Sequence, residues 1–91
     1  MNIKEKNRRL KQNCKHLVEE ANKFYVLLQD VALTNRDREL LESHKHDMDN
    51  ISFTNYEYRI LCANGISALA KRLRIRLPHE QITTILKRVE D

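Results

Sequence analysis

The side chains best suited to chemistry lie in a short basic cluster in the third quarter of the chain. Six consecutive positions contain four cations, Lys71, Arg72, Arg74 and Arg76, and the wider segment 58–77 contains no acidic residue. Such cations can neutralise phosphates and release the counterions condensed on a nucleic acid, and arginine can also donate two hydrogen bonds to a guanine edge. The cluster therefore predicts a nucleic-acid-binding surface. The alternatives are a solvated helix face and ion pairs with acidic residues elsewhere in the chain.

The segment 66–86 around this cluster is similar to a helix-turn-helix, a DNA-binding motif of two helices joined by a tight turn. Ala70 is a small residue at the position where the two helices would cross, and Ile75 lies in the turn. Arg74 departs from the motif because that turn position usually carries glycine. The second helix of such a motif enters the major groove through its first residues. In this chain the corresponding residues are His79, Gln81, Thr84 and Arg88.

Charge is unevenly distributed along the rest of the chain. Residues 1–16 contain six basic side chains and one acidic one, whereas residues 17–57 contain nine acidic and four basic ones, within a net charge of +4. A charge pattern of this kind favours electrostatic steering toward an oppositely charged partner, and steering speeds association more than it tightens binding.

An apolar seam with heptad spacing runs along the first third of the chain. Successive steps of four and three residues join Leu10, Cys14, Leu17, Ala21, Phe24, Leu28 and Val31. This spacing predicts one long helix with one apolar face, from about residue 3 to about residue 32. The seam packs either inside the chain's own bundle or against a second copy as a coiled coil. It is also the face that a helical adaptor would present to another protein.

Capping residues mark the start of two more helices. Thr34 predicts a second helix from about Asn35 to about Met48, because its hydroxyl can accept a hydrogen bond from an unpaired amide. Thr54 opens the third helix, and Glu57 three residues later completes a capping-box pattern. Ile51 and Phe53 are expected beneath the linker between these helices, where Phe53 can form a hydrophobic staple with the new helix.

The composition is typical of an all-α protein. Gly and Pro occur once each, although a β-rich domain of this size would need many tight turns. Gly65 either ends the third helix or lets two helices approach closely, and Pro78 suits the first turn of a further helix over 79–89. We therefore predict a single helical domain over residues 1–91, a bundle of three to four helices with a long N-terminal helix.

No catalytic, metal or cofactor site is recognisable. His44 and His46 lie two positions apart, whereas a helix brings residues at i and i+4 to one face, so metal ligation is not expected. A single glycine excludes a glycine-rich phosphate loop. We expect no membrane span and no secretory signal, because no run of 18 apolar residues occurs and the charged first residues are not followed by an apolar run. Cys14 and Cys62 sit in helical patterns and are expected as buried thiols of a cytoplasmic protein.

These observations leave two hypotheses for a non-enzymatic protein. In the first, the chain is a homodimeric regulator that binds DNA through the basic cluster and the helix after it. In the second, it is an adaptor or antagonist that binds another protein through the heptad face. The salt dependence of binding and the oligomeric state distinguish the two.

Overall fold

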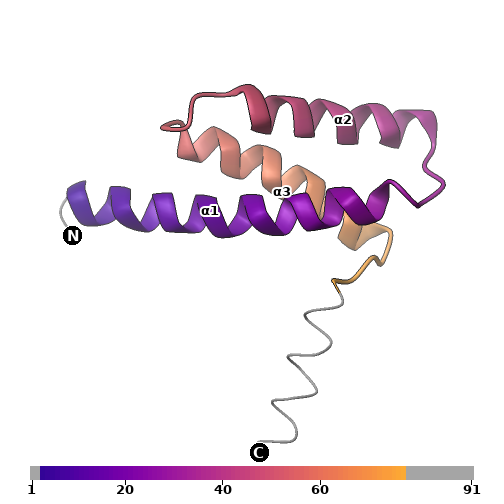
Figure 1. The fold of residues 1–91 in the computed structure, drawn as a ribbon, viewed down its shortest axis with the longest axis horizontal. Coiled ribbons are helices and arrows are strands. Elements are labelled where there is room, and N and C mark those ends of the chain that lie inside the picture. The colour runs from indigo at the N-terminus through magenta and orange to yellow at the C-terminus, as the bar shows by residue number, and fades with distance from the viewer. Residues whose placement is uncertain (1–2, 78–91) are drawn as a thin grey trace, which may run out of the picture.

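The computed structural model describes residues 3–77, which form three helices joined by short loops (Figure 1). Helix α1 spans Ile3–Leu28, α2 spans Asn35–Asn50 and α3 spans Tyr56–Arg72. Residues 3–77 contain no strand, so the prediction of an all-α chain with a long N-terminal helix is confirmed. The fourth helix predicted over 79–89 lies outside the described residues.

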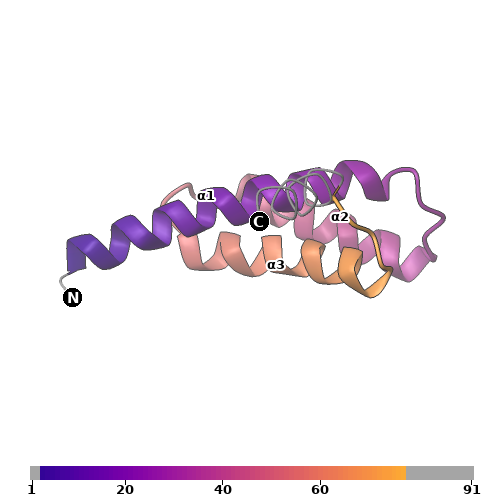
Figure 2. The ribbon, with the colours of Figure 1, turned by 90° about the horizontal axis from the view of Figure 1, so that it is seen from below.

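The three helices follow an up-down-up course in which α3 packs against both α1 and α2 (Figure 1). Helices α1 and α2 have few direct contacts with each other, so α3 provides most of the interface that holds the bundle together. The first turns of α1 extend beyond the ends of the other two helices (Figure 2). The described side chains ahead of Leu10 are accordingly all exposed.

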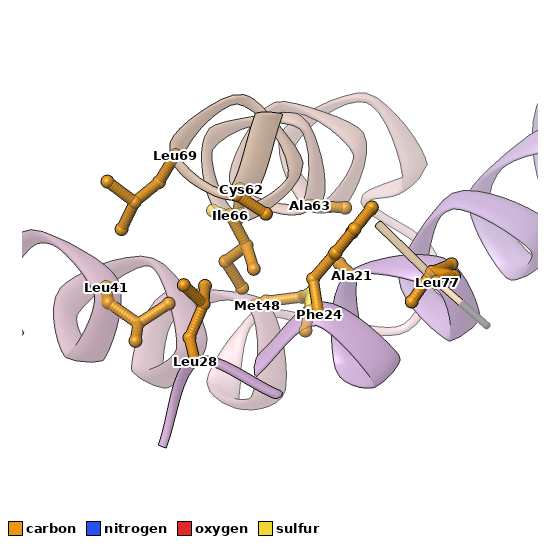
Figure 3. Close-up of a cluster of buried hydrophobic side chains, with 11 residues drawn as sticks. Ala21, Phe24, Leu28, Leu41, Met48, Cys62, Ala63, Ile66, Leu69 and Leu77 are labelled. Atoms are coloured by element: carbon orange, nitrogen blue, oxygen red, sulfur yellow. The ribbon is translucent and has the colours of Figure 1, made fainter. Parts of the chain in front are cut away.

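The core gathers apolar side chains from all three helices (Figure 3). Phe24, Leu28, Leu41, Met48 and Ile66 are each at most 1% exposed. Full burial of side chains of this size contributes about 1.5–3 kcal/mol each, which makes this cluster the main source of stability. The core lies where α3 meets the C-terminal half of α1 and the inner face of α2.

The heptad seam of α1 faces this core. Four members of the seam are buried: Cys14, Ala21, Phe24 and Leu28. The other three, Leu10, Leu17 and Val31, are half-buried. The seam therefore packs within the chain's own bundle, which was one of its two expected arrangements. Helix α1 ends at Leu28, a few residues earlier than its predicted end near residue 32.

The caps agree with the sequence for α2 and differ by one residue for α3. The Thr34 hydroxyl accepts a hydrogen bond from a backbone N–H of the first turn of α2 at 3.1 Å, as predicted. For α3, however, Asn55 is the cap: its side-chain oxygen accepts from the Tyr58 N–H at 3.4 Å. The prediction of Thr54 was wrong because its hydroxyl hydrogen-bonds instead to that of Ser52, 3.0 Å away in the preceding turn.

This shift of the cap changes the environment of Phe53. A hydrophobic staple uses the residue directly before the cap, and that residue is Thr54 once Asn55 is the cap. The expectation that Phe53 lies beneath the linker was therefore wrong, and its side chain is 79% exposed. The Arg59 guanidinium lies over the Phe53 ring, 5.0 Å from its centroid. Ile51, expected in the same place, is half-buried.

Helix α3 continues through Gly65, so this glycine does not separate two helices. A Cβ atom at this position would lie 2.6 Å from the Nε2 atom of His44 on α2. A Cβ atom does not approach a non-bonded atom this closely, so the absence of a side chain lets the His44 ring lie directly on α3. Gly65 is thus a point of close approach between α2 and α3, the second of its two expected roles.

Candidate nucleic-acid interface

The basic cluster lies where α3 ends. The N–H of Arg74 donates to the carbonyl of Lys71 at 3.0 Å, and the N–H of Ile75 donates to that of Ala70 at 2.9 Å. These two bonds are the Schellman motif, in which the residue after the cap adopts the left-handed conformation. Arg74 is that residue, with a φ of 60°. This turn position usually carries glycine, and the Cβ atom of Arg74 makes its left-handed backbone conformation strained.

From Leu73 to Leu77, apolar and basic residues alternate, and the apolar ones are the more buried. Leu73 and Ile75 are half-buried against the core and Leu77 is buried. Arg74 and Arg76, between them, are exposed. The apolar residues thus anchor the segment to the bundle while both guanidinium groups remain in water.

One cation of the cluster has a partner inside the chain. The Arg72 guanidinium lies 2.7 Å from the Asp37 carboxylate in the first turn of α2, with side chains that are 58% and 17% exposed. One alternative interpretation of the cluster was that its cations pair with acidic residues elsewhere in the chain. This interpretation is correct for Arg72. Lys71, Arg74 and Arg76 are exposed and make no ion pair with any residue between 3 and 77.

The residues predicted to read the groove, His79, Gln81, Thr84 and Arg88, lie outside the described part of the chain. Of the helix-turn-helix pattern, the structure thus describes the first helix and the turn. Ala70, the expected crossing residue, is fully buried in the core. The second helix of the motif stays a prediction.

A second basic region lies at the start of α1. Five exposed cations occur within its first nine residues: Lys4, Lys6, Arg8, Arg9 and Lys11. They lie on and beside the turns that extend beyond the bundle, at the opposite end from the turn that follows α3 (Figure 1). Helix α1 has 26 residues and is about 39 Å long at 1.5 Å per residue. The two basic regions are therefore separate surfaces.

Polar contacts link α1 to α2 and involve several residues of the acidic middle. The Tyr25 hydroxyl donates to Glu42 at 2.8 Å, and the Lys45 ammonium donates to Asn22 at 2.6 Å and pairs with Asp49 at 2.9 Å. The hydrogen bond to Glu42, together with burial, raises the pKa of the Tyr25 phenol above its ordinary value. The bonds from Tyr25 to Glu42 and from Lys45 to Asn22 hold α1 beside α2, whereas the pair of Lys45 with Asp49 lies within α2.

A groove between α1 and the start of α3 was not predicted from the sequence. The exposed ring of Phe53 stands at its edge, and Tyr56 and Val18 contribute to its lining. The only signal in the sequence was an aromatic residue in a linker, and its exposure depended on how the linker folds. Part of the predicted basic N-terminus borders this groove, including Lys11 and Lys15.

The structure offers little for covalent or metal chemistry in the described residues. Cys14 and Cys62 are unpaired and buried, and burial, followed by the nearby Asp47 carboxylate, raises the pKa of the Cys62 thiol. A thiol that keeps its proton is a poor nucleophile. Residues 3–77 contain no group of three or more histidine, cysteine or acidic side chains that could hold a metal ion. Nor is any helix within that range both long and apolar enough to cross a bilayer.

Comparison of the chain with models of protein families, with curated proteins and with solved structures found no significant match.

Proposed function

We propose that this chain binds nucleic acid through the cations at the C-terminal end of α3. The observation that carries the proposal is the group of three exposed cations, Lys71, Arg74 and Arg76, which have no acidic partner between residues 3 and 77. Like charges held this close repel one another and lower the stability of the fold. An external anion removes this repulsion, and a phosphate backbone supplies several anions at once.

The second basic region supports a polymeric anion over a single small one. The start of α1 and the end of α3 lie at opposite ends of the bundle (Figure 1), so a long polyanion such as a DNA duplex can present phosphates to both groups of cations at once. A small anion would be held by one region only. We further predict that the chain forms a homodimer and that its binding to DNA regulates transcription.

The test compares two variants of equal net charge. Arg74→Gln with Arg76→Gln removes two cations from the cluster, whereas Lys23→Gln with Arg36→Gln removes two exposed cations from the acidic middle. Affinity for a labelled random-sequence duplex of about two helical turns is measured by fluorescence anisotropy over a range of salt concentrations.

For the cluster variant, the slope of log affinity against log salt should decrease in magnitude by about 2, because about 0.9 counterions are released per phosphate contact. The control variant should keep the slope of the parent protein. Equal slopes in the two variants would show that the cluster is not the binding surface. If the parent protein does not bind the duplex at low salt, nucleic acid is not its ligand.

The heptad face is less suited to a partner protein than the sequence suggested. Helix α3 already covers it, and Phe24 at its centre is 1% exposed. A partner could reach this face only by displacing α3, which would expose the core. An adaptor function would therefore use another surface of the bundle.

A further inference from the structure

The groove beside α1 consists of two adjoining hollows of about 430 and 650 Å³. Both hollows are lined by Lys11 and Tyr56, so they form one continuous depression, named here the α1/α3 groove. Along α1 it extends from Asn7 to Glu19. At 1.5 Å per residue this length is about 18 Å, which matches about three turns of a bound helix or five to six extended residues.

The smaller hollow, of about 430 Å³, has a mostly apolar lining. Cys14 is 1% exposed, and Val18 and Tyr56 are half-buried beside it. Phe53 stands at the edge with 79% of its surface exposed. Burying a phenylalanine contributes about 1.5–3 kcal/mol, so covering this ring would favour association. The Arg59 guanidinium over the ring, 5.0 Å from its centroid, restrains the ring at the groove edge.

The rim of the α1/α3 groove carries an excess of positive charge. Four cations line it: Arg8, Lys11, Lys15 and Arg59. The lining has two acidic residues, Glu19 and Glu57. An apolar floor with a basic rim is complementary to a segment that presents an apolar side chain flanked by carboxylates.

We infer that the α1/α3 groove binds an acidic, amphipathic segment of a partner protein, which inserts an apolar side chain beside Phe53. A groove that accepts such a segment is a known mode of peptide recognition. The inference goes beyond nucleic-acid binding at the end of α3 and does not rest on it, because the start and the end of α3 lie at opposite ends of the bundle (Figure 1). The groove shares only Arg8 and Lys11 with the second basic region.

The lining favours a peptide over a single-stranded nucleic acid. Single strands are bound by several aromatic rings on which successive bases stack. In the groove, Phe53 is the one largely exposed ring of the described lining, and the Arg59 guanidinium covers one of its faces. Tyr56 is half-buried. One apolar side chain fits this arrangement, whereas a row of stacked bases does not.

The probe for the test is a fluorescein-labelled peptide of about 12 residues, designed as a helix with leucine on one face and glutamate on the other. Binding is followed by fluorescence anisotropy. The charge-reversed variant Lys11→Glu with Lys15→Glu is matched by Lys4→Glu with Lys6→Glu, which makes the same change on the same helix outside the groove.

The apolar contact is tested with Phe53→Ala. Its matched control is Leu61→Ala, which truncates a side chain that is 66% exposed on α3 and does not line the groove. All these positions are exposed, so the variants should fold, and circular dichroism checks this before binding is measured.

Charge reversal replaces two attractions with two repulsions, and Phe53→Ala removes the apolar contact that the inserted side chain makes, so each should weaken binding about tenfold or more. Both controls should bind as the parent does. Equal losses in the groove variants and their controls would show general charge attraction and overturn the inference. No binding by the parent would also overturn it. Displacement of the peptide by single-stranded oligothymidine in a Phe53-dependent manner would identify a nucleic-acid groove instead.

Discussion

Substitution of Gly65 by alanine tests the close approach of α2 and α3. In an isolated helix, Gly→Ala is stabilising by about 1 kcal/mol, because alanine loses less backbone entropy. At this position the new Cβ would lie 2.6 Å from the Nε2 atom of His44 and 2.8 Å from two ring carbons. The half-buried His44 ring must therefore move away, or the two helices must separate.

The magnitude follows from the opposition of these two effects. Forcing an extra methyl group into a packed interface costs about 1–3 kcal/mol. Subtracting the helix gain of about 1 kcal/mol leaves Gly65→Ala destabilising by about 1 kcal/mol. In a His44→Ala background the ring is absent, and the same substitution should be stabilising by about 1 kcal/mol. The coupling energy between the two positions is then about 2 kcal/mol.

The assay is urea denaturation of the four proteins of this double-mutant cycle, with circular dichroism as the signal. The dependence of the free energy on urea should be the same for all four, since each buries nearly the same surface. A change of 1 kcal/mol corresponds to about 4–8 °C in melting temperature for a domain of this size, which is easily measured. Stabilisation by Gly65→Ala in both backgrounds, with no coupling, would refute the close approach of His44 to α3.

Three further predictions concern the end of α3 and the contacts of α2. Arg74→Gly should stabilise the fold by about 1 kcal/mol in urea denaturation, because glycine adopts the φ of 60° without the Cβ penalty; lower stability would contradict the strained turn. A double-mutant cycle of Arg72 and Asp37 to alanine should give a coupling of at most about 1 kcal/mol that decreases with salt, because the guanidinium is largely exposed; a larger, salt-independent coupling would contradict this. Since the pKa of Tyr25 is raised from 10.0, its neutral phenol stabilises the fold below pH 10 and this contribution is lost as pH rises beyond it. Glu42→Gln should lower the Tyr25 midpoint in an ultraviolet titration, and an unchanged midpoint would contradict the hydrogen bond as the cause.

Local periodicity predicted the helices well. The heptad steps of α1 and the Thr34 cap depend on residues within one or two turns of each other, so the sequence contains the whole signal. Thr54 and Asn55 show the limit of this information. Both side chains can cap a helix, and only the bonding of the Thr54 hydroxyl to Ser52 in the folded turn selected Asn55.

The candidate sites were harder to predict from the sequence than the helices, because they depend on contacts between residues far apart in the chain. The basic cluster was visible in the sequence, but nothing local indicated that Arg72 would pair with Asp37, 35 residues away. The α1/α3 groove was not visible at all, because its walls come from α1, from the linker before α3 and from the first turn of α3. The exposure of Phe53 followed from the position of the cap and from the path of that linker.

The sequence by itself determined the helical class, the apolar face of α1 and the strongly basic segment at the end of α3. These properties follow from side-chain periodicity, composition and charge, which need no long-range contact. Tertiary structure decided that α3 covers the heptad face, that Gly65 brings α2 against α3, and that Arg72 alone of the four cations pairs with an acidic residue between residues 3 and 77. Each of these depends on which distant surfaces meet, because burial and ion pairing are set by contacts between helices rather than within them.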